Sequence, residues 1–252
     1  MPQVDAALFA RLEVFYDGVP RFAAHVEDFG ALALFIGSND AYPLYARPAL
    51  QAGKTPSAAD ITAVRRRQRD IGAPEAFEWV HETTPELLAV ARAAGLTVLQ
   101  APLMVLDPAA LPPAADDESV SPRLIAPDDA SFADDFALQR AVATVAFTNE
   151  GTSVGTAGAP DRDAALVPLS PGAIALQRRR AAEGRAATAL ATLTNDQVSG
   201  VVGSGLYQRE GDVAEILGIA TLPKHVMRRG QISANDALSL QLLPTPACWT
   251  TS

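Results

Sequence analysis

Apolar residues recur every three or four positions in several stretches of the chain, which is the spacing of one face of an α-helix. Near the amino terminus this face is formed by Val4, Leu8, Leu12 and Phe15. Amphipathic helices predicted in this way cover residues 1–18, 59–71, 132–142 and 174–182. Another signal, the capping-box spacing of Thr83 and Glu86 with Gly95 as a carboxy-terminal cap, predicts a helix between them.

Shorter apolar or alternating runs predict strands. They cover residues 30–37, 75–80, 96–99, 103–106, 123–125, 187–193, 198–206 and 213–222. Residues 195–196 give a hairpin signal, and residues 211–212 turn the chain into the last run. The last three runs are therefore expected to form an antiparallel meander. Gly203 and Gly205 indicate a bulge or a close backbone approach within it.

A change of composition divides the chain. Residues 107–122 are rich in Pro, Ala and acidic side chains and have little to bury, which is typical of a linker. We therefore predict an amino-terminal module at 1–106 and a second module at 123–252. Strand and helix segments follow one another in the first module, which favours a small α/β unit.

The overall composition is that of a soluble globular protein. Of 252 residues, 48% are hydrophobic and 19% are charged, so the chain can bury one large or two modest cores. The net charge of -9 argues against a nucleic-acid groove, because phosphate binding requires concentrated Lys and Arg. The basic triplet at 65–67 is expected on a solvated helix face. The expected partner is a small molecule.

Cysteine and histidine usage argues against a metal site. Cys248 is the single cysteine, and His25, His81 and His225 do not have metal-ligand spacing. His225 is expected to be a solvated turn residue rather than a catalyst. No apolar run approaches the ~20 residues of a membrane span, and Asp5 precedes any basic residue, so no signal peptide is expected. These features predict a cytoplasmic protein without metal or membrane.

Some polar residues of the first module could suggest chemistry but have a simpler interpretation. Tyr42, Tyr45 and Arg47 lie in a Pro-punctuated segment and are expected to be surface-loop residues. Glu78 and Glu82 are close enough in sequence to suggest a paired acid and base. Carboxylates on an edge strand and its exit loop are usually solvated, so we expect no catalytic role for them.

Residues 214–230 combine the features of a strand, a turn and a helix start. An apolar run meets Pro223, and a basic turn with Arg228 and Arg229 closes on Gly230. Consecutive backbone N–H groups at a helix N-terminus, beside two guanidinium groups, form a site for a pyrophosphate. The sequence thus predicts an anion-binding turn at this point.

The order of these parts resembles the acyl-coenzyme A-binding motif of the GCN5-related N-acetyltransferases. The matching residues are Glu215 in the strand, Ile219-Ala220-Thr221-Leu222-Pro223 at its end, and Arg228-Arg229-Gly230 after it. The resemblance implies an α+β fold whose mixed, largely antiparallel sheet is flanked by helices, as in acyl-CoA N-acyltransferases. The element order of the second module fits this family. The first module resembles the amino-terminal extension of certain bacterial members.

The resemblance also implies a function, the transfer of an acetyl group from the cosubstrate acetyl-CoA to a small amine. Glu215 is the implied general base, although a strand glutamate that faces solvent explains this residue equally well. The implied coenzyme-binding residues are Ile219, Ala220 and Thr221 at the pantetheine, and Arg228, Arg229 and Gly230 at the pyrophosphate.

The chain departs from the family pattern after the turn. Met227 stands where the family has Arg or Gln, and Ile232 stands where it has Gly or Ala, so a side chain crowds the phosphate. Residues 231–252 are fewer than the rest of the family fold requires. We therefore expect a truncated carboxy-terminal part, without the strand that admits pantetheine or the tyrosine that protonates the thiolate. The exposed edge of the motif strand could then join copies into a homo-oligomer.

Three functions remain open on this basis. The first is an active N-acetyltransferase for a small amine. The second is a catalytically impaired relative that binds acyl-CoA weakly or serves only as an interaction module. The third is a fragment without function.

Overall fold

The computed structural model describes residues 6–37, 44–50, 52–106, 119–149 and 154–226. The chain divides into two compact units, Met1–Asp107 and Pro108–Ser252. Each unit has its own antiparallel sheet and its own hydrophobic cluster.

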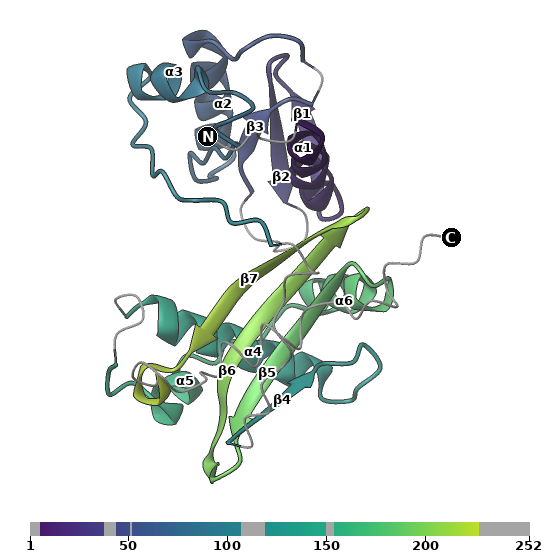
Figure 1. The fold of residues 1–252 in the computed structure, drawn as a ribbon, viewed down its shortest axis with the longest axis vertical. Helices are drawn as coiled ribbons and strands as arrows, with labels where there is room; N and C mark the ends of the chain where they lie inside the picture. Colours follow the sequence, from purple (N-terminus) through teal and green to yellow (C-terminus); the bar gives the residue numbers. More distant parts are fainter. Residues whose placement is uncertain (1–5, 38–43, 51, 107–118, 150–153, 227–252) are drawn as a thin grey trace. The chain divides into compact units, whose positions relative to one another are not determined.

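The described part of the amino-terminal unit contains a three-stranded sheet and three helices (Figure 1). Its elements are α1 (Ala6–Arg21), β1 (Ala24–Asp28), β2 (Leu32–Gly37), β3 (Ala46–Pro48), α2 (Ala58–Asp70) and α3 (Leu87–Ala93). The strand order is β1-β2-β3, and Leu34 in the central strand lies opposite Glu27 and Ala46. The core joins β2 and β3 to both α2 and α3. Its buried members are Leu32, Leu34, Ala46, Ile61, Val64, Leu87 and Ala91.

Local sequence signals explain where two of these helices begin or end. The Asp60 N–H donates to Ser57 Oγ at 3.2 Å, and the Ser57 N–H donates to Asp60 Oδ2 at 2.8 Å, so a complete capping box starts α2. Gly95 follows α3 with φ of 81°, a left-handed conformation that glycine adopts most readily. The prediction of a cap at Gly95 is confirmed.

Two predictions in the amino-terminal unit are wrong because side chains bond to distant elements. Arg47 is not a surface-loop residue: it lies in β3, is only 2% exposed, and forms an ion pair with Glu13 of α1. Its guanidinium carbon also lies 5.8 Å from the centre of the Tyr16 ring. The predicted capping box of Thr83 is absent, because the Thr83 hydroxyl lies 2.6 Å from Glu13 Oε1 and α3 starts only at Leu87.

The basic triplet at 65–67 is also less solvated than predicted. Arg67 donates two hydrogen bonds to Glu27, at 2.8 and 2.7 Å. The hydrogen bond from Arg67 lowers the pKa of the Glu27 carboxyl. Arg65 pairs with Glu75 and donates to the Ala94 carbonyl at 2.6 Å. These bonds tie α2 to β1 and to the end of α3.

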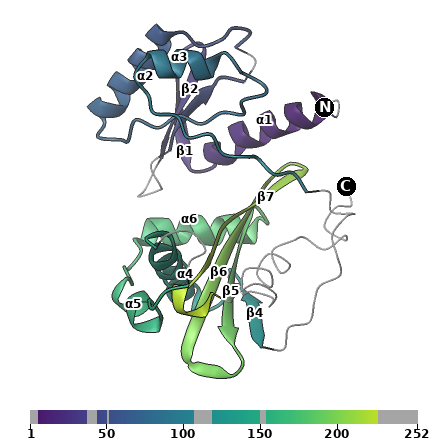
Figure 2. The same ribbon diagram turned by 60° about the vertical axis from the view of Figure 1, so that its left-hand side comes forward.

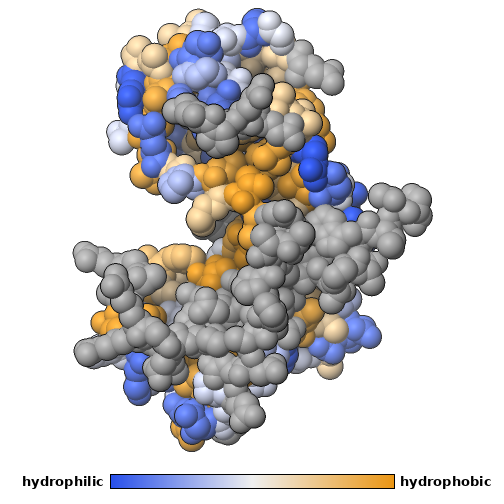
Figure 3. All heavy atoms as spheres, in the orientation of Figure 1, coloured by the Kyte–Doolittle hydropathy of each residue, from blue (hydrophilic) through white to orange (hydrophobic). Residues whose placement is uncertain are grey.

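Three predicted strands of this unit do not form. Residues 75–80 contribute a single parallel bridge, between Phe77 and Ala46, and residues 96–99 and 103–106 are in no strand of the described chain. Leu99 and Met104 are each 89% exposed there. Figure 3 shows hydrophobic as well as hydrophilic surface on this unit. An apolar run becomes a strand only where a neighbouring edge is available to pair with it.

Among its described residues, the carboxy-terminal unit contains a four-stranded antiparallel sheet with the order β4-β5-β6-β7. Its elements are β4 (Val120–Leu124), α4 (Phe132–Phe147), α5 (Ala159–Ala164), α6 (Pro171–Ala182), β5 (Ala186–Leu193), β6 (Asp196–Glu210), β7 (Val213–Thr221) and a 3₁₀ turn, η2 (Pro223–His225). The helices α4, α5 and α6 lie on one side of the sheet (Figure 2). β4 begins at Val120, three residues before the predicted start of the second module.

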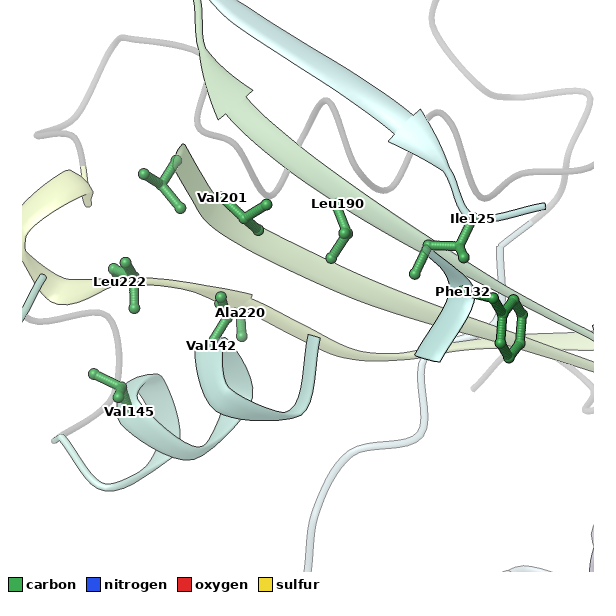
Figure 4. Close-up of a cluster of buried hydrophobic side chains, with 9 residues drawn as sticks. Ile125, Phe132, Val142, Val145, Leu190, Val201, Ala220 and Leu222 are labelled. Atoms are coloured by element: carbon green, nitrogen blue, oxygen red, sulfur yellow. The ribbon is translucent and has the colours of Figure 1, made fainter. Parts of the chain in front are cut away.

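The main core of this unit lies between the sheet and α4 (Figure 4). Val142 and Val145 of α4 meet Leu190 of β5 and Ala220 of β7. The whole buried cluster consists of Ile125, Phe132, Val142, Val145, Leu190, Val201, Val202, Ala220 and Leu222. A second cluster, on Ala189, Ala191 and Tyr207, packs with Ile216 and Ile219 of β7.

The meander of β5, β6 and β7 confirms the predicted hairpins. Leu193 pairs with Asp196 across the first turn, and Glu210 pairs with Val213 across the second. The structure has the predicted α+β composition, with antiparallel sheets flanked by helices.

Candidate active site

The strand β7 carries a bulge near its end. It lies across from Gly203 and Gly205 of β6, the two glycines at which the sequence predicted a bulge or a close backbone approach. Ser204 pairs with Ala220, whereas Leu206 pairs with Leu217, so Gly218 and Ile219 together face the single residue between them on β6. Gly218 has φ of 61°, a conformation that a side chain would strain. The bulge turns the last residues of β7 out of the earlier register.

After the bulge, the backbone of β7 alternates between bonding to β6 and pointing away from it. The Leu222 N–H donates to the Val202 carbonyl at 2.9 Å, and bonded positions alternate along an antiparallel pair. Ala220 therefore bonds to β6, while the backbone groups of Thr221 point to the other side of β7. The side chains of Ala220 and Thr221 are buried.

The turn after β7 is braced by the loop between α4 and α5. The Gly155 N–H donates to the Pro223 carbonyl at 3.1 Å, and the Lys224 N–H donates to the Ala157 carbonyl at 3.0 Å. The side chains of the turn also lie close to the loop: a Cβ on Gly155 would lie 2.9 Å from Pro223 Cβ, and one on Gly158 would lie 3.1 Å from Lys224 Cδ. The glycines of this loop thus permit close backbone contact with the turn.

Arg162 fixes α5 against the start of β6. It is 7% exposed, and its Nη1 donates to the carbonyls of Ser199 at 2.7 Å and Val201 at 2.5 Å. Its Nε and Nη2 donate to Asp163 Oδ1 at 2.8 and 2.7 Å. Gly200, between the two bonded carbonyls, has φ of 60°. The guanidinium therefore supplies hydrogen-bond donors to two carbonyls of β6, where this strand departs from regular pairing with β5.

His225 is partly buried, so the prediction of a solvated residue is wrong. Its Nε2 is buried and has no hydrogen-bond partner in the described part of the chain. Burial lowers the pKa of the His225 imidazole, because the charged form loses hydration. Asp196 acts in the opposite direction, while Lys224 and Arg162 add to the lowering. The imidazole is neutral at pH 7.

Glu215 lies near the start of β7 and has a defined partner across the sheet. Gln208 of β6 is directly opposite, and its Nε2 donates to Glu215 Oε2 at 2.7 Å. Gln208 Oε1 in turn accepts from Arg180 Nη2 of α6 at 3.3 Å. The carboxylate is partly buried within this polar group.

Comparison with known proteins gives one structural match. No protein-family model matches the chain, and no curated protein matches it. A solved structure described as a GCN5-related N-acetyltransferase from Kribbella flavida superposes on 93% of this chain and 80% of its own, with a TM-score of 0.61 and 19% sequence identity. The chain has the fold of a GCN5-related N-acetyltransferase. The sequence resemblance is therefore confirmed at the level of the fold.

In this acetyltransferase fold the predicted site residues lie along one strand. Glu215 and Thr221 are both in β7, six positions apart on the two sides of the bulge, which corresponds to about 20 Å of extended chain. Ile219 and Ala220 lie between the bulge and Thr221. The other predicted coenzyme residues, Arg228, Arg229 and Gly230, lie outside the described residues, as do Met227 and Ile232.

The fold also brings Gln208 to Glu215 and Arg180 to Gln208, and sequence reasoning missed both contacts. The position of Gln208 could have been predicted from the register of the β6–β7 hairpin. A turn at Gly211 and Asp212 that pairs Glu210 with Val213 also places Gln208 opposite Glu215. No comparable sequence signal places Arg180 there, because its contact depends on how α6 packs.

Neither a metal site nor a membrane-spanning helix is found among the described residues. They contain no group of three or more His, Cys, Asp or Glu that could hold a metal ion. Among the same residues, no helix has both the length and the apolar character needed to cross a membrane.

Proposed function

We propose that this protein is an acetyl-CoA-dependent N-acetyltransferase that acts on a small amine, with Glu215 as the general base. The observation that carries the proposal is the strand β7, which has the Glu215 carboxylate on one side of the bulge and Ile219, Ala220 and Thr221 on the other. The acetyltransferase fold supports it.

The proposed reaction needs little from the protein beyond positioning and one proton acceptor. Glu215 takes a proton from the ammonium group of the acceptor. The free amine attacks the thioester carbonyl, a C–N bond forms, and the C–S bond breaks. The nitrogen then loses its second proton, which protonates the leaving coenzyme thiolate to the thiol. Backbone groups at Ile219 and Thr221 would bind the pantetheine, and the basic segment 228–230 would bind the pyrophosphate.

Binding and turnover together test the proposal. Coenzyme A should raise the melting temperature, since a ligand that binds only the folded state stabilises it. Exchanging both Arg228 and Arg229 for Ala should remove the effect, and Arg140→Ala, at an exposed arginine of α4, should not. Acetyl-CoA with a panel of small amines should release thiol, and Glu215→Gln should lower this rate by roughly 10²-fold with little change in coenzyme affinity.

A second candidate is a relative that binds acyl-CoA weakly without catalysing transfer. The departures at Met227 and Ile232 favour it, because a side chain at the second position crowds the phosphate. In that case coenzyme A stabilises the fold, Ile232→Gly strengthens binding, and no thiol is released. A folded protein that gives no calorimetric signal at millimolar acetyl-CoA would reject both candidates.

A further inference from the structure

The face of the carboxy-terminal sheet that points away from α4 is apolar and buried. Side chains alternate between the two faces of a strand, so Ala189 and Ala191 point away from α4, which Leu190 contacts. The exposed fraction of each of these two alanines is 0%. We call this surface the outer face. It consists of Val120, Ala187, Ala189, Ala191, Leu193, Tyr207, Ala214, Ile216 and Ile219.

The strands cannot bury the outer face by themselves. On β6, Gly205 lies opposite Ala189 and Gly203 lies opposite Ala191, and glycine has no side chain that could shield a neighbouring methyl group. The helices α4, α5 and α6 lie on the other side of the sheet (Figure 2). A sheet that is buried on both faces has a layer of structure on each. All described members of the outer face lie in the strands, so its covering layer is not among them.

We propose that the carboxy-terminal segment 233–243 is this layer, and that it docks on the outer face of its own sheet as an amphipathic helix. Residues 227–252 lie outside the described part of the chain. The sequence of the segment, its polarity and the point from which it starts each fit the outer face. The docking does not depend on whether the protein transfers acetyl groups.

The segment has start and stop signals for a helix. Ser233 and Asp236 have the Ser-x-x-Asp spacing that forms the capping box of α2. Pro244 prevents the helix from continuing. One face of this helix carries four apolar residues and one glutamine, which are Ala234, Ala237, Leu238, Gln241 and Leu242. The two alanines allow a close approach to a sheet surface built from alanine and glycine.

Polarity distinguishes this segment from another one outside the described residues. The outer face has no charged residue among its described members. The segment 233–243 has one, Asp236, which falls on the side of the helix opposite to Leu238. Residues 107–118 contain four acidic side chains and three prolines, so they offer no apolar helix face. The carboxy-terminal segment is therefore the better cover.

The chain also leaves the described residues at a suitable place. They end at Val226, just after η2 and the strand β7. Residues 227–232 span about 20 Å when extended, whereas β5 is two strand spacings from β7, about 10 Å. A helix over residues 234–243 is about 15 Å long, close to the three spacings, about 14 Å, between β4 and β7. The segment can thus reach the outer face and cross it.

Photo-crosslinking in the full chain tests which segment is the cover. With p-benzoylphenylalanine in place of Leu238, irradiation should join this position to residues 187–191, 203–207 or 214–219 of the same molecule. Mass spectrometry of the digested protein identifies the joined peptides. The same amino acid in place of Ser239, which points away from the docked face, is the matched control and should give no such product.

Stability gives a second readout that does not depend on the bulky probe. Leu238→Asp places an unpaired carboxylate on the buried face, so the urea midpoint of the carboxy-terminal unit should fall by on the order of 1 M. Ser239→Asp adds the same charge on the solvent side of the helix and should leave the midpoint near that of the wild type.

Docking would also hold the predicted pyrophosphate segment 228–230 between two fixed ends, η2 and the docked helix. This consequence rests on the proposed function. It predicts that Leu238→Asp weakens coenzyme A binding and that Ser239→Asp does not. If the crosslink forms but the wild type does not bind coenzyme A, the segment still covers the outer face, and the proposed function is what fails.

The crosslinked products decide between this segment and other covers. A dimer on a denaturing gel would show that residue 238 reaches a second copy, and products with the amino-terminal unit would place it there. Either result, or the lack of any product with the outer face, would overturn the proposal. A Leu238→Asp protein that is as stable as the wild type would overturn it as well.

Discussion

The burial of His225 makes the stability of the protein sensitive to acid. Because folding lowers the pKa of this imidazole below its usual 6.5, the unfolded chain binds the proton more tightly. The stability that the neutral imidazole permits is complete above about pH 6.5 and is lost as the pH falls toward the folded-state pKa. The urea midpoint should therefore be lower at about pH 5.5 than at about pH 7.5, and His225→Gln should flatten this difference.

The exposed His81 provides the matched control for that measurement. His81→Gln should leave the pH dependence of the urea midpoint as it is in the wild type. An unchanged pH dependence in His225→Gln would mean that other groups cause it. The carboxyl of Asp196, whose pKa is lowered chiefly by its bond from Ser199, titrates at a lower pH and does not interfere.

Removing the buried guanidinium of Arg162 should lower the free energy of unfolding of the carboxy-terminal unit. Arg162→Met keeps much of the side-chain volume but leaves the Ser199 and Val201 carbonyls without their donor. Such losses in a buried site cost about 2–4 kcal/mol in the free energy of unfolding. Urea denaturation should show this loss for Arg162→Met and almost none for Arg140→Met, an exposed arginine on α4. Equal stability of the two variants would contradict the bonding role.

At the scale of elements, the contact between the α4–α5 loop and the turn after β7 predicts different effects for two Gly→Ala substitutions. In Gly155→Ala the new methyl would lie 2.9 Å from Pro223 Cβ, and neither group can move without shifting backbone. In Gly158→Ala the nearest atom, at 3.1 Å, belongs to the flexible Lys224 side chain. Gly155→Ala should lower the melting temperature by several degrees, because overpacking costs about 1–3 kcal/mol. Gly158→Ala should stay near the wild type.

The same pair of variants tests whether the loop matters for the proposed site. If the loop braces the turn that precedes residues 228–230, Gly155→Ala should also weaken coenzyme A binding in a calorimetric titration. Gly158→Ala should bind as the wild type does. A destabilised Gly155→Ala protein with unchanged affinity would separate the fold of the loop from the binding of the coenzyme.

Elements that depend on local signals could be predicted, and those that depend on distant partners could not. The helices α2 and α4 follow from apolar periodicity, which the chain carries within the element itself. The strand β1 was missed because His25 and Glu27 interrupt its apolar character. The runs at 96–99 and 103–106 have strand composition, but no described strand pairs with them. Pairing is a non-local property that composition does not contain.

The candidate site divides in the same way. The strand that carries Glu215 and residues 219–221 could be predicted, since its apolar run is a local pattern, and the role of these residues in a site stays a prediction. Gln208 was within reach through the register of the hairpin at 211–212. Arg180 was not, because a helix residue meets a strand only through tertiary packing.

At the scale of the whole molecule, each of the two units has a hydrophobic core of its own. We therefore predict that residues 1–106, expressed alone, unfold cooperatively in urea, and that the full chain shows a transition at the same midpoint. Leu34→Ala removes a side chain that is 1% exposed, and it should lower this midpoint equally in the fragment and in the full chain. The expected loss is about 2–5 kcal/mol.

The matched variant for the other unit is Leu190→Ala, which removes a fully buried side chain of β5. In the full chain it should lower a second transition by a similar amount and leave the Leu34-sensitive transition in place. This separation is expected because Leu34 and Leu190 belong to the hydrophobic clusters of different units. A single transition that both variants lower together, or an unfolded fragment, would show that the two cores form one cooperative unit and would reject the boundary at 107–122.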